Sequence, residues 1–166
     1  SQFRPYKPIY DLKTKKKSIT EGRGLLQAFI QFVQTNPTAS ALSEHFDIPG
    51  FIKAQAAEIV MGAVDHYVRV GNNYYLYFNP TTERWTYVVT DFGFVFRDSH
   101  AMTNGAIEGF EAFRDIMGTV AFPSPDNISW AGRVAGGVNP ILWNIVFSDQ
   151  ANKALLYTEI QAILTL

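Results

Sequence analysis

The chain has 166 residues, a length typical of one domain, and a formal net charge of −1, which argues against a general nucleic-acid binder. Hydrophobic residues make up 47% and charged residues only 17%, which excludes a disordered chain. The absence of cysteine excludes a disulfide framework, a thiolate zinc site and cysteine catalysis.

The first residues predict a linker, a strand and a basic loop. Residues 1–8 are polar and contain prolines, as in a linker or a cut end. Residues 9–14 alternate apolar and polar side chains, which favours a short strand. The lysines at positions 13 and 15–17 are expected to lie in a solvated loop.

A first helix is predicted after this loop. Ser18 and Glu21 have the spacing of a capping box, and apolar residues then recur at helical spacing as far as Val33. Asn36-Pro37 ends the helix, because the residue before a proline avoids helical backbone angles.

Two further helices have their own capping signals. Thr38 is placed to cap a short helix through about His45. Asp47 is placed to cap a longer one, which has Pro49 in its first turn and is predicted to run to about Tyr67.

The longer helix is apolar nearly all round, which places it in the middle of a core. Its charged residues exclude a membrane span, which needs about 20 mostly apolar residues. Asp65 and His66 are expected at its C-terminal end, where an acidic side chain opposes the helix macrodipole. Such a conflict between an acidic side chain and the helix dipole often marks function or strain. His66, at the same helix end, is expected to be solvated.

An aromatic β-hairpin follows. Residues 72–78 (NNYYLYF) and 85–90 (WTYVVT) have the composition of strands, and residues 79–83 supply the turn. An Asp-Phe-Gly tripeptide begins at Asp91, directly after the second strand.

The remainder is expected to be a loop-rich insertion over residues 98–139, with one short helix around 108–117. Helical spacing returns from Pro140 to Leu164. The three tryptophans are interpreted as core residues.

Four polar residues around the hairpin have the types that phosphoryl transfer needs. Asp65, Asn72 and Asn73 precede the hairpin, and Asp91 follows it. One carboxylate orients the attacking hydroxyl, a second holds the metal that bridges the phosphates, and an amide often completes the metal shell. Taken singly, each of the four is better explained as a residue of a turn or a helix end.

Residues 56–92 together resemble the centre of the spore coat protein H (CotH) kinase family: an apolar helix, an aspartate, an NYYLY-type strand, a tryptophan-bearing strand and a second aspartate. The segments YDLKT at 10–14, LLQAFIQFV at 25–33 and HFDIPGFIKAQAA at 45–57 are similar to the family's upstream elements. Residues 138–164 are similar to its closing helices.

The resemblance implies an α+β, atypical protein-kinase-like fold with a mostly helical C-terminal lobe and a central β-hairpin. It implies ATP and Mg²⁺ or Mn²⁺ as cofactors, protein serine as substrate, and a spore-coat, secreted or cell-surface setting. Asp65 would be the catalytic aspartate and Asp91 a metal ligand. Asn73, with Asn72, would complete the cofactor and metal site.

The sequence departs from the family pattern in several respects. Ala63-Val64 stands where the family has Asn-Trp before the first aspartate, and Arg97 stands where it has a glycine, unless that glycine is displaced. Gly93 stands where the family has a second acidic residue, which weakens metal binding.

The chain is also about half as long as the family's domain, which exceeds the usual domain size. It has no glycine-rich phosphate loop upstream of Asp65, and no strand lysine with a matching helix glutamate. The nearest strand lysine, Lys13, belongs to a late segment of the family pattern. We therefore expect a single C-lobe-like domain over 1–166, whose N-terminal lobe comes from a missing segment or a partner chain.

An apolar face that meets this missing lobe would account for the low charge and the 14% aromatic content. It predicts an exposed apolar patch beside Asp65 and Asp91. Two other functions stay open: a catalytically degenerate binding or scaffolding module, and a structural or adhesive surface module.

Overall fold

The computed structural model describes residues 13–14, 18–61, 63, 66–93, 95 and 140–165. Within these ranges the chain forms helices and one two-stranded antiparallel sheet, so the predicted α+β class is confirmed. The elements are α1 (Ile19–Gln34), α2 (Ala39–Ser43), α3 (Ile48–Val60), α4 (Tyr67–Val70), β1 (Tyr74–Asn79), β2 (Arg84–Val89), α6 (Ile141–Val146) and α7 (Gln150–Leu164).

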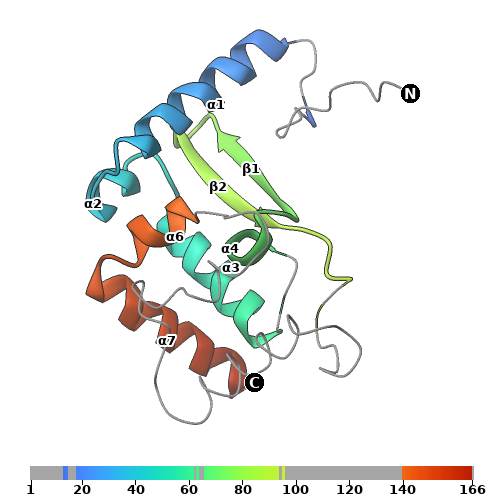
Figure 1. Cartoon of the computed structure of the whole chain (residues 1–166), viewed down its shortest axis with the longest axis vertical. Helices are drawn as coiled ribbons and strands as arrows, with labels where there is room; N and C mark the ends of the chain where they lie inside the picture. Colours follow the sequence, from blue (N-terminus) through green and yellow to red (C-terminus); the bar gives the residue numbers. More distant parts are fainter. Residues whose placement is uncertain are drawn as a thin grey trace, which may run out of the picture.

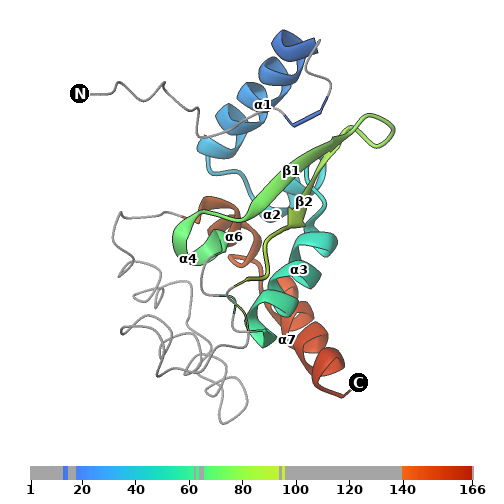
Figure 2. The ribbon, with the colours of Figure 1, turned by 90° about the vertical axis from the view of Figure 1, so that its right-hand side faces the viewer.

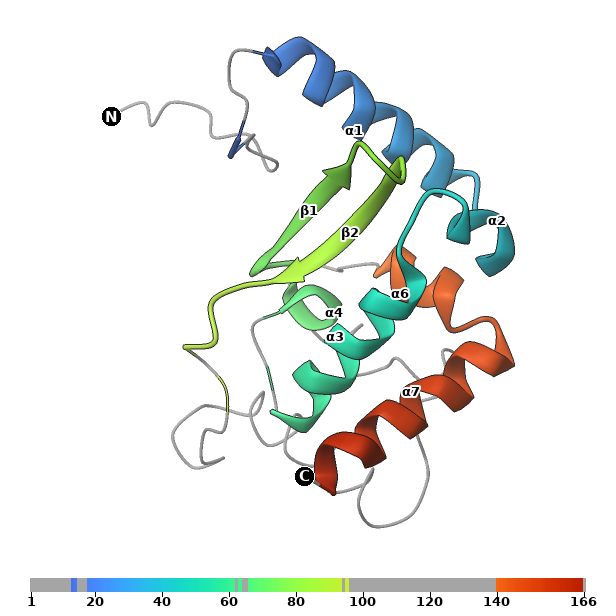
Figure 3. The same ribbon diagram turned by 180° about the vertical axis from the view of Figure 1, so that it is seen from behind.

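Helix α3 lies in the middle of the molecule, with α7 packed along it and β2 against it (Figure 1). Helix α1 lies over the turn half of the hairpin, and α4 lies at the hairpin's open end (Figure 3). The view from the side shows the hairpin and α7 on different sides of α3 (Figure 2). No helix in the described ranges is long and apolar enough to cross a membrane.

The helix starts agree with the capping signals. The Thr38 hydroxyl accepts a hydrogen bond from the Ala41 N–H at 3.2 Å, and Asp47 Oδ1 accepts one from the Gly50 N–H at 3.1 Å. A Cβ atom at position 50 would collide with the Asp47 carboxylate, so this cap needs glycine. Ser18 is the N-cap of α1, as expected, but its side chain makes no capping hydrogen bond.

The prediction that the third helix runs to Tyr67 is wrong, because α3 ends at Val60. The Ala63 N–H donates to the Glu58 carbonyl at 2.9 Å, the six-residue bond of a Schellman motif. The predicted conflict with the macrodipole of this helix therefore does not arise, and His66 instead precedes α4.

The hairpin is confirmed, and its register divides its side chains between two faces. Tyr74 pairs with Val89 at the open end, and Asn79 pairs with Arg84 at the turn. The inner face packs on the core through Tyr74, Leu76, Phe78, Trp85 and Tyr87. The edge of β2 is covered by the segment before α3, because Trp85 exchanges backbone hydrogen bonds of 2.8 Å with His45 and Asp47.

Phe51 of α3 is the centre of the aromatic core. Its ring centroid lies 5.2 Å from that of Tyr87, 5.5 Å from Phe46, 6.1 Å from Tyr67 and 6.4 Å from Phe147. Each such aromatic pair contributes about 0.5–1.5 kcal/mol beyond its buried area. The core therefore joins α3, α4, the hairpin and the C-terminal helices.

Several predictions fall on residues outside the described ranges. These are the linker at 1–8, residues 9–12 of the predicted strand, the lysines at 15–17, and the insertion at 98–139 with its helix and Trp130. Lys13 and Thr14, the described end of the predicted strand, are not in a strand. Trp85 and Trp143 are buried, as predicted.

Candidate active site

The open end of the hairpin brings Asn73 and Asp91 to the same edge of the sheet. The Thr90 N–H donates to the Asn73 carbonyl at 3.0 Å, which extends the strand pairing by one residue beyond β1 and β2. Asn73 and Asp91 both have left-handed backbone angles, with φ of 55° and 56°. Asn and Asp tolerate this conformation better than other non-glycine residues. Asn72, exposed, lies next to Asn73.

The Asp91 side chain closes a local turn. Its Oδ1 atom accepts a hydrogen bond from the Gly93 N–H at 3.2 Å, and the residue is exposed to solvent. A Cβ atom at position 93 would lie 3.1 Å from the same oxygen, which is tighter than ordinary contact. Glycine at this position therefore leaves the carboxylate room to take up this turn.

The backbone of Asp91 is held from the other side by His66. The Nε2 atom of His66 lies 3.0 Å from the Asp91 carbonyl oxygen, so it donates a hydrogen bond to that oxygen. The His66 ring also contacts Phe92 edge to face, with centroids 5.7 Å apart. His66 is only 1% exposed, so the prediction that it is solvated is wrong.

A buried carboxylate lies beyond His66. The Nδ1 atom of His66 lies 3.4 Å from Oε1 of Glu58 on α3, and Glu58 is 6% exposed. The same Oε1 accepts a hydrogen bond from the Tyr87 hydroxyl at 2.7 Å, and Oε2 accepts one from Gln55 Nε2 at 3.0 Å. These donors offset the large cost of burying a carboxylate.

Tyr87 remains a donor over the whole physiological pH range. Burial, and after it the neighbouring Glu58 carboxylate, raise the pKa of the Tyr87 hydroxyl far above its usual value of 10.0. The hydroxyl therefore keeps its proton and its bond to Glu58. The result is a chain of contacts from the core to the backbone of Asp91.

The sequence model of the family described as CotH kinase protein matches residues 2–165, nearly the whole chain. The chain belongs to the CotH kinase protein family. The family resemblance predicted from residues 56–92 is therefore confirmed. No curated protein and no solved structure matches the sequence significantly.

The donor set at the open end of the hairpin suits a hard divalent cation in this CotH family chain. Mg²⁺ takes oxygen ligands and is commonly held by one or two carboxylates together with substrate phosphates and water. Asp91 offers an exposed carboxylate, and Asn73 lies across the hairpin from it. Among the described residues no three acidic or histidine side chains gather into a metal cluster. Asp65 lies outside the described residues, so its catalytic role stays a prediction.

The outer face of the hairpin in this CotH family chain carries exposed apolar side chains. Tyr75 and Val88 are cross-strand partners, and Tyr77 is 55% exposed two residues along β1. Phe92, next to Asp91, is also exposed. Of these side chains Phe92 is the one adjacent to Asp91 in the chain, and the predicted apolar patch beside Asp65 and Asp91 stays a prediction.

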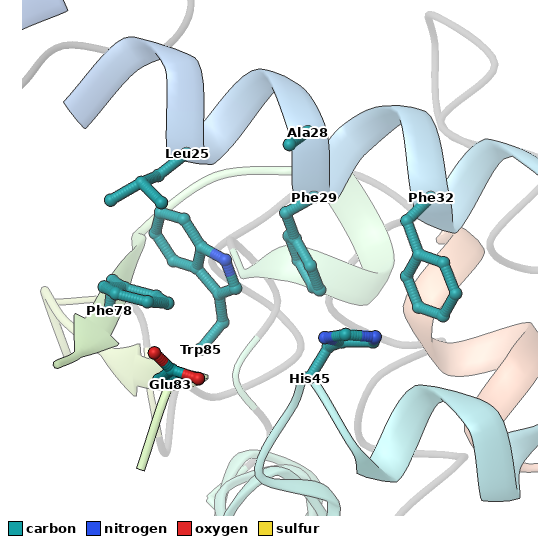
Figure 4. A pocket seen from close by; sticks show the side chains of 8 residues that line it. All are labelled: Leu25, Ala28, Phe29, Phe32, His45, Phe78, Glu83 and Trp85. Carbon is teal, nitrogen blue, oxygen red and sulfur yellow. The ribbon is translucent and has the colours of Figure 1, made fainter. Parts of the chain in front are cut away.

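A separate hollow of about 230 Å³ lies at the other end of the hairpin, between α1 and the turn (Figure 4). Aromatic and aliphatic side chains line most of it, and His45 and Glu83 are its only titratable lining residues. The lining residues are Leu25, Ala28, Phe29, Phe32, His45, Phe78, Glu83 and Trp85. None of the predicted site residues belongs to this lining.

Sequence reasoning missed the buried residues behind Asp91. Gln55 and Glu58 are polar residues three positions apart on a helix that is otherwise apolar nearly all round. A polar pair on a buried helix needs buried hydrogen-bond partners, and this requirement could have indicated a buried polar site beside the helix. The identity of those partners, Tyr87 and His66, follows only from the fold.

Proposed function

We propose that this CotH family chain forms the C-terminal lobe of an atypical protein kinase, which transfers the γ-phosphate of ATP to a serine hydroxyl of a protein. The observation that carries the proposal is the placement of Asp91 at the open end of the hairpin beside Asn73. Its carboxylate is exposed there, while its backbone is fixed by His66. The N-terminal lobe would be supplied by a preceding segment or a partner chain.

Each predicted site residue would have its own role in the transfer. Asp91 and Asn73, with Asn72 beside them, would hold Mg²⁺ or Mn²⁺ and so orient the phosphates of ATP. The bound cation supplies positive charge that offsets the charge developing on the transferred phosphoryl group. Asp65, the catalytic aspartate by family resemblance, would accept the serine proton. The serine oxygen then bonds to the γ-phosphorus as the bond to the β-phosphate oxygen breaks, and ADP leaves.

Nucleotide binding by the purified chain tests this proposal. We expect Mg²⁺ and ATP together to raise the melting temperature, and the Asp91→Asn variant to lose that shift, because the amide removes the charge that holds the cation. Glu44→Gln, at an exposed residue of the α2 C-terminus, is the matched control and should keep the shift. An equal shift in wild type and Asp91→Asn would contradict the proposed site.

A second candidate function is a binding or scaffolding module without catalysis. Gly93 favours it, because the N–H of this glycine occupies an Asp91 oxygen where the family has another acidic residue. Radiolabelled ATP separates the two: label on protein serine, lost in Asp65→Asn, supports the kinase. Cation-dependent ATP binding without transfer, in the presence of the N-terminal lobe, supports the scaffold. By family resemblance, either activity would operate at a spore coat or a cell surface.

A further inference from the structure

The Asp91 carbonyl needs a partner that the hairpin does not give it. Regular pairing of β1 and β2 ends at Tyr74 and Val89, and the last backbone bond joins Thr90 to Asn73. Asp91 follows with a left-handed backbone angle, φ 56°, outside the paired residues of the two strands. His66, 25 residues earlier in the chain, meets that carbonyl with its Nε2 atom at 3.0 Å.

His66 is itself oriented by its surroundings. Its other ring nitrogen lies 3.4 Å from Glu58 Oε1, and its ring edge packs on Phe92. Glu58 is fixed in turn by Tyr87 from β2 and Gln55 from α3. The imidazole is almost completely buried, yet the group it holds is the backbone of an exposed residue. The ring is held at Nε2 by its hydrogen bond to Asp91 and has its Nδ1 side toward Glu58, so it links α3 to the backbone of Asp91.

We propose that His66, oriented by Glu58, is a positioning residue that fixes the Asp91 carboxylate for a divalent cation. The inference rests on the proposed cation-binding role of Asp91. His66 and Glu58 contribute no ligand atoms to the cation. They restrict the backbone of Asp91, and so fix the position of its carboxylate and the bond that this carboxylate accepts from Gly93. Residues that orient a metal ligand in this way commonly change metal affinity by about 10–100-fold when they are replaced.

Two amide substitutions separate the bond to Asp91 from the mere filling of space. A glutamine amide reaches about as far as Nε2 of histidine, and an asparagine amide about as far as Nδ1. His66→Gln can therefore keep the bond to the Asp91 carbonyl, whereas His66→Asn can reach only toward Glu58. If His66 only filled space in the core, the two variants would differ in stability but not in Mn²⁺ binding or in the Gly93 resonance.

The experiment measures Mn²⁺ binding by electron paramagnetic resonance and the Gly93 amide resonance by NMR, both on the full chain without nucleotide. We expect His66→Asn to weaken Mn²⁺ binding about tenfold or more and to shift the Gly93 resonance. His66→Gln should stay within about threefold of wild type, and Glu44→Gln should change neither readout. Wild-type affinity and an unmoved Gly93 resonance in His66→Asn would overturn the proposal, as would equal losses in both histidine variants.

The experiment distinguishes failure of the cation site at Asp91 from failure of the positioning role of His66. If wild type binds no Mn²⁺, the cation site is wrong, and the Gly93 resonance alone still reports whether His66 positions Asp91. If His66→Asn does not fold, Glu58→Gln carries the test, since it removes the charge that faces Nδ1. A Gly93 resonance that stays at its wild-type position in Glu58→Gln would contradict the positioning role.

Discussion

The two ends of the hairpin are built on different physical principles. At the turn, Trp85 lies against Phe29 of α1 with ring centroids 5.5 Å apart, in a largely apolar environment. At the open end, Asp91 is exposed and is held by single hydrogen bonds from His66 and Gly93. Burial of apolar area stabilises strongly but has no direction, whereas a few bonds stabilise little and fix position. The fold thus anchors the hairpin at one end and presents its polar groups at the other.

The largest expected effect belongs to the turn end. Trp85→Ala should lower the free energy of unfolding by about 3–5 kcal/mol, because it leaves a cavity between the hairpin and α1. Urea unfolding measures this loss. Tyr77→Ala is the control on the outer face of the same hairpin, and we expect less than about 0.5 kcal/mol there. Similar losses in the two variants would contradict the assignment of the two faces.

The next effect lies in the polar chain behind Asp91. Tyr87→Phe removes the donor to the buried Glu58 and should cost about 1.5–3 kcal/mol at neutral pH, because a hydrogen bond to a charged group is lost. The measurement is again urea unfolding at pH 7. A cost near zero would show that Glu58 finds another donor.

The same tyrosine predicts how stability depends on alkaline pH. The raised pKa of Tyr87 means that the unfolded chain loses this proton above pH about 10 while the native chain keeps it. The native state then binds more protons, so its stability falls as pH rises, by about 1.4 kcal/mol per pH unit for this group. The advantage of wild type over Tyr87→Phe should therefore shrink above pH about 10. An advantage that stays constant between pH 9 and 11 would contradict the burial of this hydroxyl.

The smallest expected effect is that of Gly93→Ala, which should change the position of the Asp91 carboxylate with almost no change in stability. Gly93→Ala places a Cβ atom 3.1 Å from Asp91 Oδ1, so we expect weaker Mn²⁺ binding, by less than the loss in His66→Asn, and a stability change within about 0.5 kcal/mol. Gly24→Ala is the matched control, because a Cβ there meets nothing within 4 Å. It should stabilise exposed helix α1 by about 0.5–1 kcal/mol and leave Mn²⁺ binding unchanged. Equal Mn²⁺ affinity in both variants would remove the role assigned to Gly93.

Local signals in the sequence were sufficient to predict most of the elements. Thr38 and Asp47 cap the helices that they were predicted to cap, and aromatic alternation located the hairpin. The end of α3 was missed because apolar periodicity continues past Gly62 and Ala63, while the terminating bond to Glu58 is a property of the backbone.

The site could be predicted only in part for a related reason. Asn73 and Asp91 flank a hairpin, so strand pairing alone brings them to one edge. The buried position of His66 is set by its contacts with two distant residues. These are Glu58 on α3 and Asp91, which follows the hairpin. Such contacts are set by tertiary packing, which residue spacing does not encode.

The most direct test of the central claim compares the two ends of the hairpin in one spectrum. Mn²⁺ added to the isotope-labelled chain broadens the resonances of amides close to the bound ion. We expect the amides of Asn73, Phe92 and Gly93 to broaden first, and those of Thr81 and Glu83 at the turn to remain sharp. Broadening that begins at the turn, or that reaches both ends equally, would contradict a cation site at Asp91.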